Sequence, residues 1–232
     1  MTYIVRPIEH YECKEWLLYK HYARRMPQIV YSFGLFENEK MVGICTFGFP
    51  PTIFFNSLFK NIDTIELNRL VVNDGLPKNT LSFFVSKCLN ILPDFVVVSY
   101  ADPNQNHHGY IYQATNWIYT GMGRKNIKDK RGVNKYFNNG KEYHERHLME
   151  TMKSLRFLID EQKTQNENWV DNGGNIVKQL RKHRYFFVTG NNRTKKKYRS
   201  EIEKYYGKHE YPKGENKKYD SSFVPTTQIK LF

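Results

Sequence analysis

Short apolar runs separated by polar breaks fill the first 122 residues of the chain. Two runs rich in β-forming residues, at 29–36 and 41–49, flank the polar stretch 37–40, a pattern that is typical of a β-hairpin. Helical spacing of apolar residues predicts a helix from Pro7 to about Ala23. The remaining runs predict a strand at 64–72, a helix at 81–92, a strand at 95–100, a short helix at 109–115 and a strand at 117–120.

The order of these elements predicts the fold class. A hairpin followed by strand, helix, strand, helix and strand implies an α/β fold, with a mixed central β-sheet flanked by helices. The run at 95–100 is apolar without interruption except for Ser99, as expected for a strand that is covered on both faces. This order is similar to that of the GNAT acyltransferases, although other α/β folds share it.

The second half of the chain has a different pattern. We expect a helix at 141–159, a polar connector at 163–174, a short helix at 176–182 and an aromatic strand at 185–189. Lysines interleaved with tyrosines follow from 195 to 218. Because no clear linker separates the halves, we expect a GNAT-like catalytic core at 1–122 and a basic α/β extension at 123–232 that packs on it.

Charge is divided unevenly between these halves. The chain has 36 basic and 23 acidic residues, a net charge of +13. Residues 1–122 contain ten of each sign, whereas residues 123–232 contain 26 basic and 13 acidic residues. Such segregation predicts that the extension contacts nucleic acid, with a merely solvated surface as the alternative. The phosphate contacts are expected from Lys182, His183, Arg184, Lys195, Lys196, Lys197 and Arg199.

Composition also argues against several protein classes. Cys13, Cys45 and Cys88 are widely spaced in apolar surroundings, so reduced core thiols are expected rather than a disulfide or a zinc site. No secretory signal and no membrane-spanning apolar stretch is recognisable, so we expect a cytoplasmic protein with no membrane partner. Zinc-protease, Walker, serine-hydrolase and methyltransferase motifs are all missing from the sequence.

Polar residues with catalytic potential follow the buried strand at 95–100. Asp102 ends this strand, His107 lies in the next loop, and Tyr112 lies in the short helix. Open α/β sheets bind ligands at the carboxyl ends of their strands, so we expect a site here; a turn-capping Asp with solvated histidines is the structural alternative. His21, with Asp102 and Tyr112, would supply a metal with oxygen and nitrogen ligands.

The strand at 64–72 is interrupted by charged and polar residues. Glu66 and Asn68 are expected on one face of the strand and Arg69 on the other, since side chains alternate along a strand. Charged groups in a central strand need partners, so these residues face a ligand cleft or form a plain structural ion pair.

The turn at 73–80 leads into a helix whose amino end would attract an anion. Asn79 and Ser82 lie at that end, and we expect them to contact a donor molecule. The paired glycines that are usual in a coenzyme A loop are absent, which weakens the case for an acyl-coenzyme A donor.

Taken together, these segments resemble the consecutive sequence blocks of the Mom family of phage DNA modification proteins. The most specific block runs from Ser99-Tyr-Ala-Asp102 through His107-x-Gly-x-Ile-Tyr112-Gln-Ala-Thr-Asn116-Trp. The resemblance extends over residues 15 to 213, nearly the whole chain. Its other blocks are Glu66-x-x-Arg69, Asn79-x-x-Ser82, Gly140-Lys-x-x-His-x-Arg146, Lys182-His-Arg-Tyr-Phe186 and Tyr211-Pro-Lys213.

The resemblance implies an enzyme that converts the exocyclic amine of adenine in double-stranded DNA to a carbamoylmethyl form. That modification shields phage DNA from host restriction. The resemblance also implies iron as a possible cofactor, and it leaves open an acyl-coenzyme A or another activated donor. It marks Arg69, Ser82, Asp102 and Tyr112 as catalytic.

The chemistry of the target suits the division of charge. The adenine amine is paired inside the duplex and must be extruded, at a cost that phosphate contacts and aromatic stacking can offset. We expect Asp102 to act as base or metal ligand, and Tyr112 as acid or ligand. Arg69 is expected to contact donor or phosphate, and Ser82 the donor. The substrate- and donor-binding residues expected besides these are Glu66, Asn68, Asn79, His107 and Asn116.

Two functions from other classes remain open from the sequence. One is a GNAT-type N-acetyltransferase acting on a protein or tRNA, and the other is a non-enzymatic DNA-binding protein whose polar cluster is structural. The sequence does not predict the donor, the bound metal, the DNA target sequence or the oligomeric state.

Overall fold

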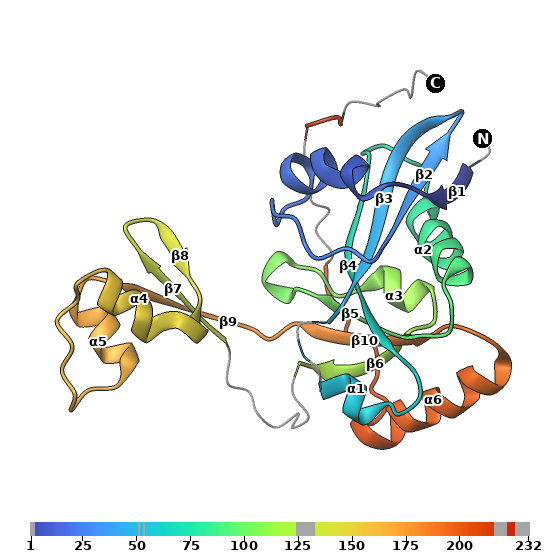
Figure 1. Cartoon of the computed structure of the whole chain (residues 1–232). Helices are drawn as coiled ribbons and strands as arrows, with labels where there is room; N and C mark the ends of the chain where they lie inside the picture. The colour runs from blue at the N-terminus through green and yellow to red at the C-terminus, as the bar shows by residue number, and fades with distance from the viewer. Residues whose placement is uncertain (1–2, 51, 53, 124–132, 216–221, 226–232) are drawn as a thin grey trace. The chain divides into compact units, whose positions relative to one another are not determined.

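The computed structural model describes residues 3–50, 52, 54–123, 133–215 and 222–225 (Figure 1). The chain forms two compact units, one made of Met1–Lys125 and Lys182–Phe232, the other of Asn126–Arg181. We call them the sheet unit and the inserted unit. No helix among the described residues is long and apolar enough to cross a membrane.

The sheet unit is built on seven strands in the order β1-β2-β3-β4-β5-β10-β6. Only β4 and β5 run parallel, and every other neighbouring pair is antiparallel. This mixed sheet, flanked by helices, confirms the predicted α/β class. The strands are β1 (Tyr3–Pro7), β2 (Tyr31–Glu37), β3 (Lys40–Gly48), β4 (Thr64–Val72), β5 (Val96–Ala101), β6 (Ile118–Met122) and β10 (His183–Val188).

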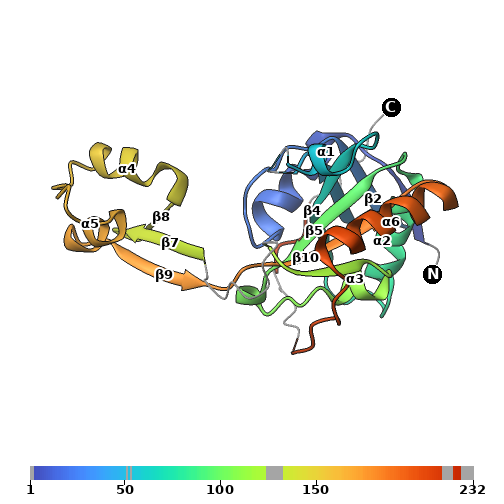
Figure 2. The same ribbon diagram turned by 90° about the horizontal axis from the view of Figure 1, so that it is seen from below.

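Helices cover both faces of the sheet (Figure 2). Alternate residues of β5 show the division, because Val97 packs with α2 and α3 whereas Val96 and Val98 pack with α1 and α6. Two short helices, η1 and η2, cover β3 and β4 on the α6 side, where Trp16 is buried. These helices are η1 (His10–Cys13), η2 (Trp16–Lys20), α1 (Phe54–Leu58), α2 (Thr80–Ile91), α3 (Tyr110–Ala114) and α6 (Asn192–Tyr206).

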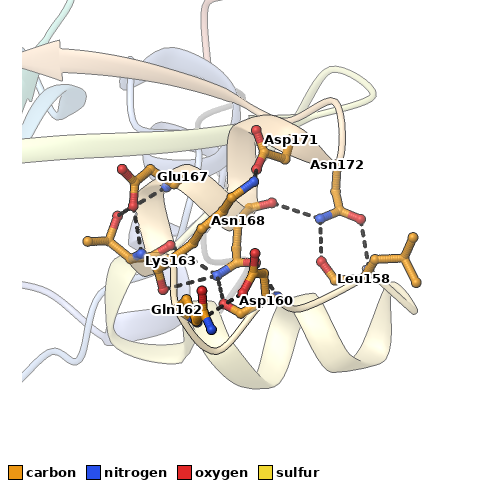
Figure 3. Close-up of polar contacts among 9 residues, drawn as sticks. Leu158, Asp160, Gln162, Lys163, Glu167, Asn168, Asp171 and Asn172 are labelled. Carbon is orange, nitrogen blue, oxygen red and sulfur yellow. Dashed lines mark hydrogen bonds and ion pairs between the residues drawn. The ribbon is translucent and has the colours of Figure 1, made fainter.

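The inserted unit has a core of its own, centred on Trp169. Its loop before α5 is held by side-chain amides (Figure 3): Asn168 Nδ2 donates to Asp160 O at 2.9 Å, and Asn172 Nδ2 donates to Leu158 O at 2.8 Å. The unit consists of a three-stranded sheet, β8-β7-β9, with β7 (Val133–Asn138), β8 (Lys141–Tyr143), β9 (Asn175–Gln179), the short η4 (Glu145–His147), α4 (Leu148–Ser154) and α5 (Gln165–Asp171).

Several predicted elements are corrected by the structure. The single helix expected from Pro7 to about Ala23 is instead the two separate short helices η1 and η2, and the residues just before it form β1, which pairs with β2. The expected helix at 141–159 is β8, η4 and α4, and Arg156 beyond it has a positive φ of 57°. The expected helix at 176–182 is strand β9, because its residues find a partner in β7. The expected connector contains α5, which begins with a capping box of Thr164 and Glu167.

The two units also differ from the expected halves. Strand β10 returns to the main sheet and pairs with β6, with Met122 opposite His183, and Gly123 N donates to Lys182 O at 3.0 Å. The inserted unit therefore lies in the chain between β6 and β10, which are adjacent strands of the main sheet. Residues 182–232 hold thirteen basic and five acidic residues, against eleven and eight in residues 126–181. Most of the positive excess thus belongs to the sheet unit.

Candidate active site

The parallel strands β4 and β5 separate after a short region of contact. They pair with each other only from Thr64 opposite Val96 to Glu66 opposite Val98. Among the described strands, the later residues of β4 pair only with β3, and the later residues of β5 pair only with β10. Ser99 spans the opening, with its Oγ 2.8 Å from Leu67 O and 2.7 Å from the Tyr112 hydroxyl. A serine hydroxyl has one hydrogen and a carbonyl only accepts, so Tyr112 donates to Ser99 and Ser99 donates to Leu67.

Tyr112 is held at this opening in its protonated form. Its side chain is buried in the core on the α2 and α3 face, and burial raises the pKa of its hydroxyl above the usual range. The hydrogen bond with Ser99 acts in the opposite direction and is weaker than burial. Tyr112 therefore keeps its proton at neutral pH.

A β-bulge at Asn68 corrects the predicted facing of the charges in β4. Thr46 pairs with Arg69 and the next residue of β3, Phe47, pairs with Leu67, which leaves Asn68 as the extra residue. The bulge shifts the alternation, so Glu66 and Arg69 lie on the same face of the sheet rather than on opposite faces. Asn68 itself is used structurally: its Oδ1 accepts from Thr46 Oγ1 at 2.6 Å and its Nδ2 donates to Gln28 O at 2.9 Å.

Glu66 is a desolvated carboxylate without a partner. Burial raises its pKa to about 7, while the charges of Arg69 and Lys182 act to lower it. Among the residues that the structure describes, its carboxylate forms no hydrogen bond or ion pair. Arg69 likewise has unsatisfied hydrogen-bonding capacity. Its Nη1 donates to Asn68 O at 2.6 Å, but its buried Nε has no hydrogen-bond partner. Both groups can accept a ligand.

Asp102 lies at the carboxyl end of β5, as predicted, and is well supported. Its Oδ1 accepts from Asn104 N at 3.0 Å and from Asn104 Nδ2 at 2.8 Å, and its Oδ2 lies 3.7 Å from Lys182 Nζ. Its carbonyl accepts from His107 N, which closes the loop that carries His107. Asp102 is thereby oriented, and Lys182 is brought to the same edge.

The segment after η2 brings His21, Tyr22 and Arg25 to this edge. The ring of Tyr22 stacks on His21 at 4.4 Å and meets His107 edge-on at 5.7 Å. His21 Nδ1 accepts from Ala23 N at 3.0 Å, so a neutral His21 carries its proton on Nε2. Burial and the nearby charges of Arg69, His107, Lys182 and Arg25 lower the pKa of His21 to about 3. His21 is neutral at physiological pH.

The three donors that we expected to bind a metal do not form such a set. His21 uses Nδ1 for Ala23, Asp102 uses Oδ1 for Asn104, and the Tyr112 hydroxyl donates to Ser99. Within the described part of the chain, no three His, Cys, Asp or Glu side chains are grouped as a metal site requires. These residues do not fit a bound iron ion, so the chemistry proposed below uses protein groups only.

Two predicted DNA-binding residues are corrected by burial. His183 and Arg184 lie in the central strand β10 and are only 5% and 4% exposed. His183 Nδ1 lies 2.8 Å from the Tyr119 hydroxyl, and Arg184 Nε donates to Thr120 Oγ1 at 2.9 Å, with its guanidinium 3.9 Å above the Tyr206 ring. Neither side chain can reach a phosphate. The exposed Lys182, whose side chain is 51% accessible, still can.

Among the described residues, the other predicted residues form no hydrogen bond or ion pair with Glu66 or Asp102. Ser82 is in the first turn of α2 and donates to Asn79 O at 2.9 Å, while the Asn79 side chain is exposed and does not cap the helix. Asn116 is an exposed turn residue whose carbonyl accepts from Arg199 Nη1 at 3.5 Å. Lys195, Lys196 and Lys197 lie in α6 with Arg199.

Sequence reasoning missed three residues of the cluster, namely Tyr22, Arg25 and Tyr100. Tyr100 is a largely buried neighbour of Glu66 and Arg184, and burial raises its pKa above the usual range. It is two residues before Asp102 in a strand, so the period of two places both on one face. Tyr22 and Arg25 had a weaker signal, because nothing in the sequence brings the end of the first helix to β5.

This arrangement of a polar cluster at diverging parallel strands occurs in a chain that matches the Mom protein family model over residues 2–213. The chain belongs to the Mom protein family. Methylcarbamoylase mom of Escherichia phage Mu is 30% identical to it over 112 residues, which cover 44% of this chain and 46% of that protein. The match therefore spans less than half the length of this relative.

Two solved structures are similar in backbone. An acetyltransferase of the GNAT family from Bacillus cereus has a TM-score of 0.41 at 10% identity, covering 82% of this chain and 100% of its own. An N-acetyltransferase from Staphylococcus aureus has a TM-score of 0.40 at 13% identity, covering 81% and 99%. Family membership rests on the family model and not on these two likenesses.

Proposed function

We propose that the chain transfers a carbamoylmethyl group to the exocyclic amine of adenine in double-stranded DNA, and that the product protects phage DNA from host restriction. Membership of the Mom family supports this reaction, as does the name methylcarbamoylase carried by the phage Mu relative. The enzyme would act in the cytoplasm of the host cell, where that DNA lies.

One observation carries the proposal: an unpaired, partly buried Glu66 faces the same site as Asp102, Arg69 and Lys182. When the amine nitrogen bonds to the methylene carbon of the donor, the bond from that carbon to the donor's leaving group breaks, the leaving group departs with the electron pair, and the nitrogen must lose one proton. Glu66 with a pKa of about 7 is partly ionised at neutral pH and can accept that proton, which Asp102 is less free to do because Asn104 and Lys182 engage its oxygens. Asp102 instead orients the amine.

The remaining groups have supporting roles in this proposal. The Tyr112 hydroxyl, which donates to Ser99 in the free protein, turns its hydrogen to the negative charge that develops on the donor, and the cations Arg69 and Lys182 attract the anionic substrate. The adenine stacks against Tyr22 or His107 once it leaves the duplex. Ser82 and Asn79, at the amino end of α2, contact the donor, whose identity is open between acyl-coenzyme A and another activated compound.

Mass spectrometry of nucleosides from host DNA tests the proposal. Expression of the chain should yield a carbamoylmethyl deoxyadenosine and resistance to restriction enzymes that have adenine in their sites. Unmodified adenine in the presence of folded protein would contradict it, and acetylation of a peptide or tRNA without DNA modification would favour a different transferase.

Matched variants separate catalysis from folding in the same assay. Asp102→Ala and Tyr112→Phe should each reduce modification about 100-fold or more, because Asp102 orients the amine and Tyr112 stabilises the charge that develops on the donor. Tyr185→Phe is the control for Tyr112→Phe, because it removes another largely buried hydroxyl, which donates to His108 O at 2.6 Å outside the cluster. Equal losses of modification in both Phe variants would assign Tyr112 to structure alone.

A further inference from the structure

Three cations meet at the edge of the sheet near His21 with few anionic partners. Lys182 Nζ lies 3.7 Å from Asp102 Oδ2. The Nε of Arg69 is buried without a hydrogen bond, because the bulge at Asn68 turns this side chain into the site. Arg25 is exposed and forms no hydrogen bond or ion pair with any described residue. Arg25 lies three residues after Tyr22, whose ring is 5.7 Å from that of His107, and His107 N donates to the carbonyl of Asp102, the partner of Lys182. The charges of all three cations also act on His21.

The carboxylates of the cluster do not balance these charges. Asp102 is paired with Lys182, and Glu66, with a pKa of about 7, is only partly ionised at neutral pH. The cluster is therefore positive, although residues 1–122 as a whole contain equal numbers of acidic and basic residues. Cations gathered at one edge repel one another, most strongly where one of them, here Arg69, is partly buried, and an anion bound among them relieves that repulsion.

We propose that Arg25, Arg69 and Lys182 form a binding site for a phosphoryl group, occupied during the reaction by the backbone phosphate next to the adenosine that enters the site. The DNA assignment rests on the proposed function. Guanidinium groups match phosphate oxygens with paired hydrogen bonds, and Lys182 supplies a point charge. Tyr22 and His107 lie beside these cations, so a nucleotide could place its base on the rings and its phosphate on the charges.

A phosphorylated donor would present the same chemistry as a DNA phosphate, so the experiment has two arms. The first measures binding of the full chain to a short oligonucleotide with one adenine among thymines, and to the same strand with uncharged methylphosphonate linkages on both sides of that adenine. A third strand carries the uncharged linkages between distant thymines. The second arm measures binding of inorganic pyrophosphate to the full chain.

Arg24 provides a matched control for Arg25. It is the neighbouring residue, equally exposed, and its charge is not among those that act on His21. Arg25→Gln should weaken binding of the natural oligonucleotide about tenfold, whereas Arg24→Gln should change it less than twofold. Neutral linkages at the adenine should weaken binding to the wild type and to Arg24→Gln by a similar tenfold, and should have little further effect on Arg25→Gln.

Each outcome decides part of the proposal. Equal losses in Arg24→Gln and Arg25→Gln, or equal effects of neutral linkages at the adenine and elsewhere, would overturn the phosphoryl site. Loss of pyrophosphate binding in Arg25→Gln without sensitivity to the linkages would assign the site to the donor and overturn the DNA assignment. If host DNA stays unmodified while the coupling between Arg25 and the linkages holds, the phosphoryl site stands and the proposed reaction fails.

Discussion

Glu66 has the ionisation that a proton acceptor at neutral pH needs, and it obtains this at a cost in stability. Burial raises its pKa in the folded chain to about 7, above the ordinary value of 4.5 that applies when the chain is unfolded. The folded state then holds its proton more tightly than the unfolded state does. Stability that is present below about pH 4.5 is accordingly lost as the pH rises through 7.

We predict that Glu66→Gln is more stable than the wild type at pH 8 by roughly 2 kcal/mol, after allowance for partial solvent access, and that the difference disappears near pH 4.5. Urea unfolding at both pH values measures it. Modification by this variant should be lost. Glu37→Gln serves as the control. It removes a carboxylate from β2, where Glu37 pairs with Lys40, at the opposite end of β3 from the residue that pairs with Glu66. A pH-independent difference would mean that Glu66 ionises normally.

The bulge in β4 is the element on which the pairing of charges depends. Ile65, Leu67, Leu70 and Val72 all pack into one core, and only an extra residue between Leu67 and Leu70 allows this. Asn68 fills that position and ties it to Thr46 and Gln28. Gly48 permits the close approach, since a Cβ there would lie 2.0 Å from Gln28 O and 2.8 Å from Asn68 Nδ2.

We predict that Asn68→Ala lowers the free energy of unfolding by about 1–3 kcal/mol, because two side-chain hydrogen bonds are lost at a partly buried site. Asn90→Ala, at an exposed position in α2, should be neutral or slightly stabilising, since alanine has the higher helix propensity. Urea titration of both variants tests this. If Asn68→Ala lowers the free energy of unfolding no more than Asn90→Ala does, the packing of the apolar residues alone is enough to maintain the bulge.

We predict that helix α6 contacts DNA. Tyr198, Ile202 and Tyr206 anchor its buried face, while Lys196 and Lys197 are exposed near its amino end. Each phosphate that a protein neutralises contributes about −0.9 to the slope of log affinity against log salt. Replacement of Lys195, Lys196 and Lys197 by Ala should make this slope shallower by about two to three units in duplex binding.

A control for α6 removes the same charge from the rest of the sheet unit. Lys14, Lys40 and Lys87 are exposed outside α6. Their replacement by Ala should leave the salt slope almost unchanged. A slope that responds equally to both triple variants would mean that these lysines act only through net charge.

The sequence predicted the elements of the first half better than those of the second. Hydrophobic periodicity located the strand that contains Glu66 and the strand that ends just before Asp102. Asp102 accordingly lies at the carboxyl end of β5, as predicted. The predicted face for Arg69 was wrong, because strict alternation of side chains takes no account of a bulge. The three-residue step between the apolar residues Leu67 and Leu70 was the sign of the bulge in the sequence. Segment 176–182 was wrong because its strand depends on pairing with β7, a contact that local propensity does not contain.

At the scale of the whole molecule, the inserted unit is separable from the sheet. Its neighbours in the chain, Gly123 and Lys182, already touch through a backbone hydrogen bond of 3.0 Å. We predict that replacement of residues 126–181 by a short glycine-serine linker leaves the sheet unit folded, as circular dichroism and thermal melting would show. Replacement of 126–188, which also removes β10 from the centre of the sheet, should abolish folding. Equal damage by both deletions would mean that the units are interdependent.

The first and last strands of the inserted unit pair with each other, and this pairing affects how the chain folds. Val133 is paired with Gln179 inside that unit, just as Met122 is paired with His183 in the sheet. Joining β6 to β10 across an unstructured chain of about 60 residues would cost about 2 kcal/mol more entropy than joining them across about five. If the inserted unit folds first, that cost is already met, and β10 reaches β6 as in an ordinary hairpin. A mutation in the core around Trp169 would then slow assembly of the main sheet without touching any residue of it.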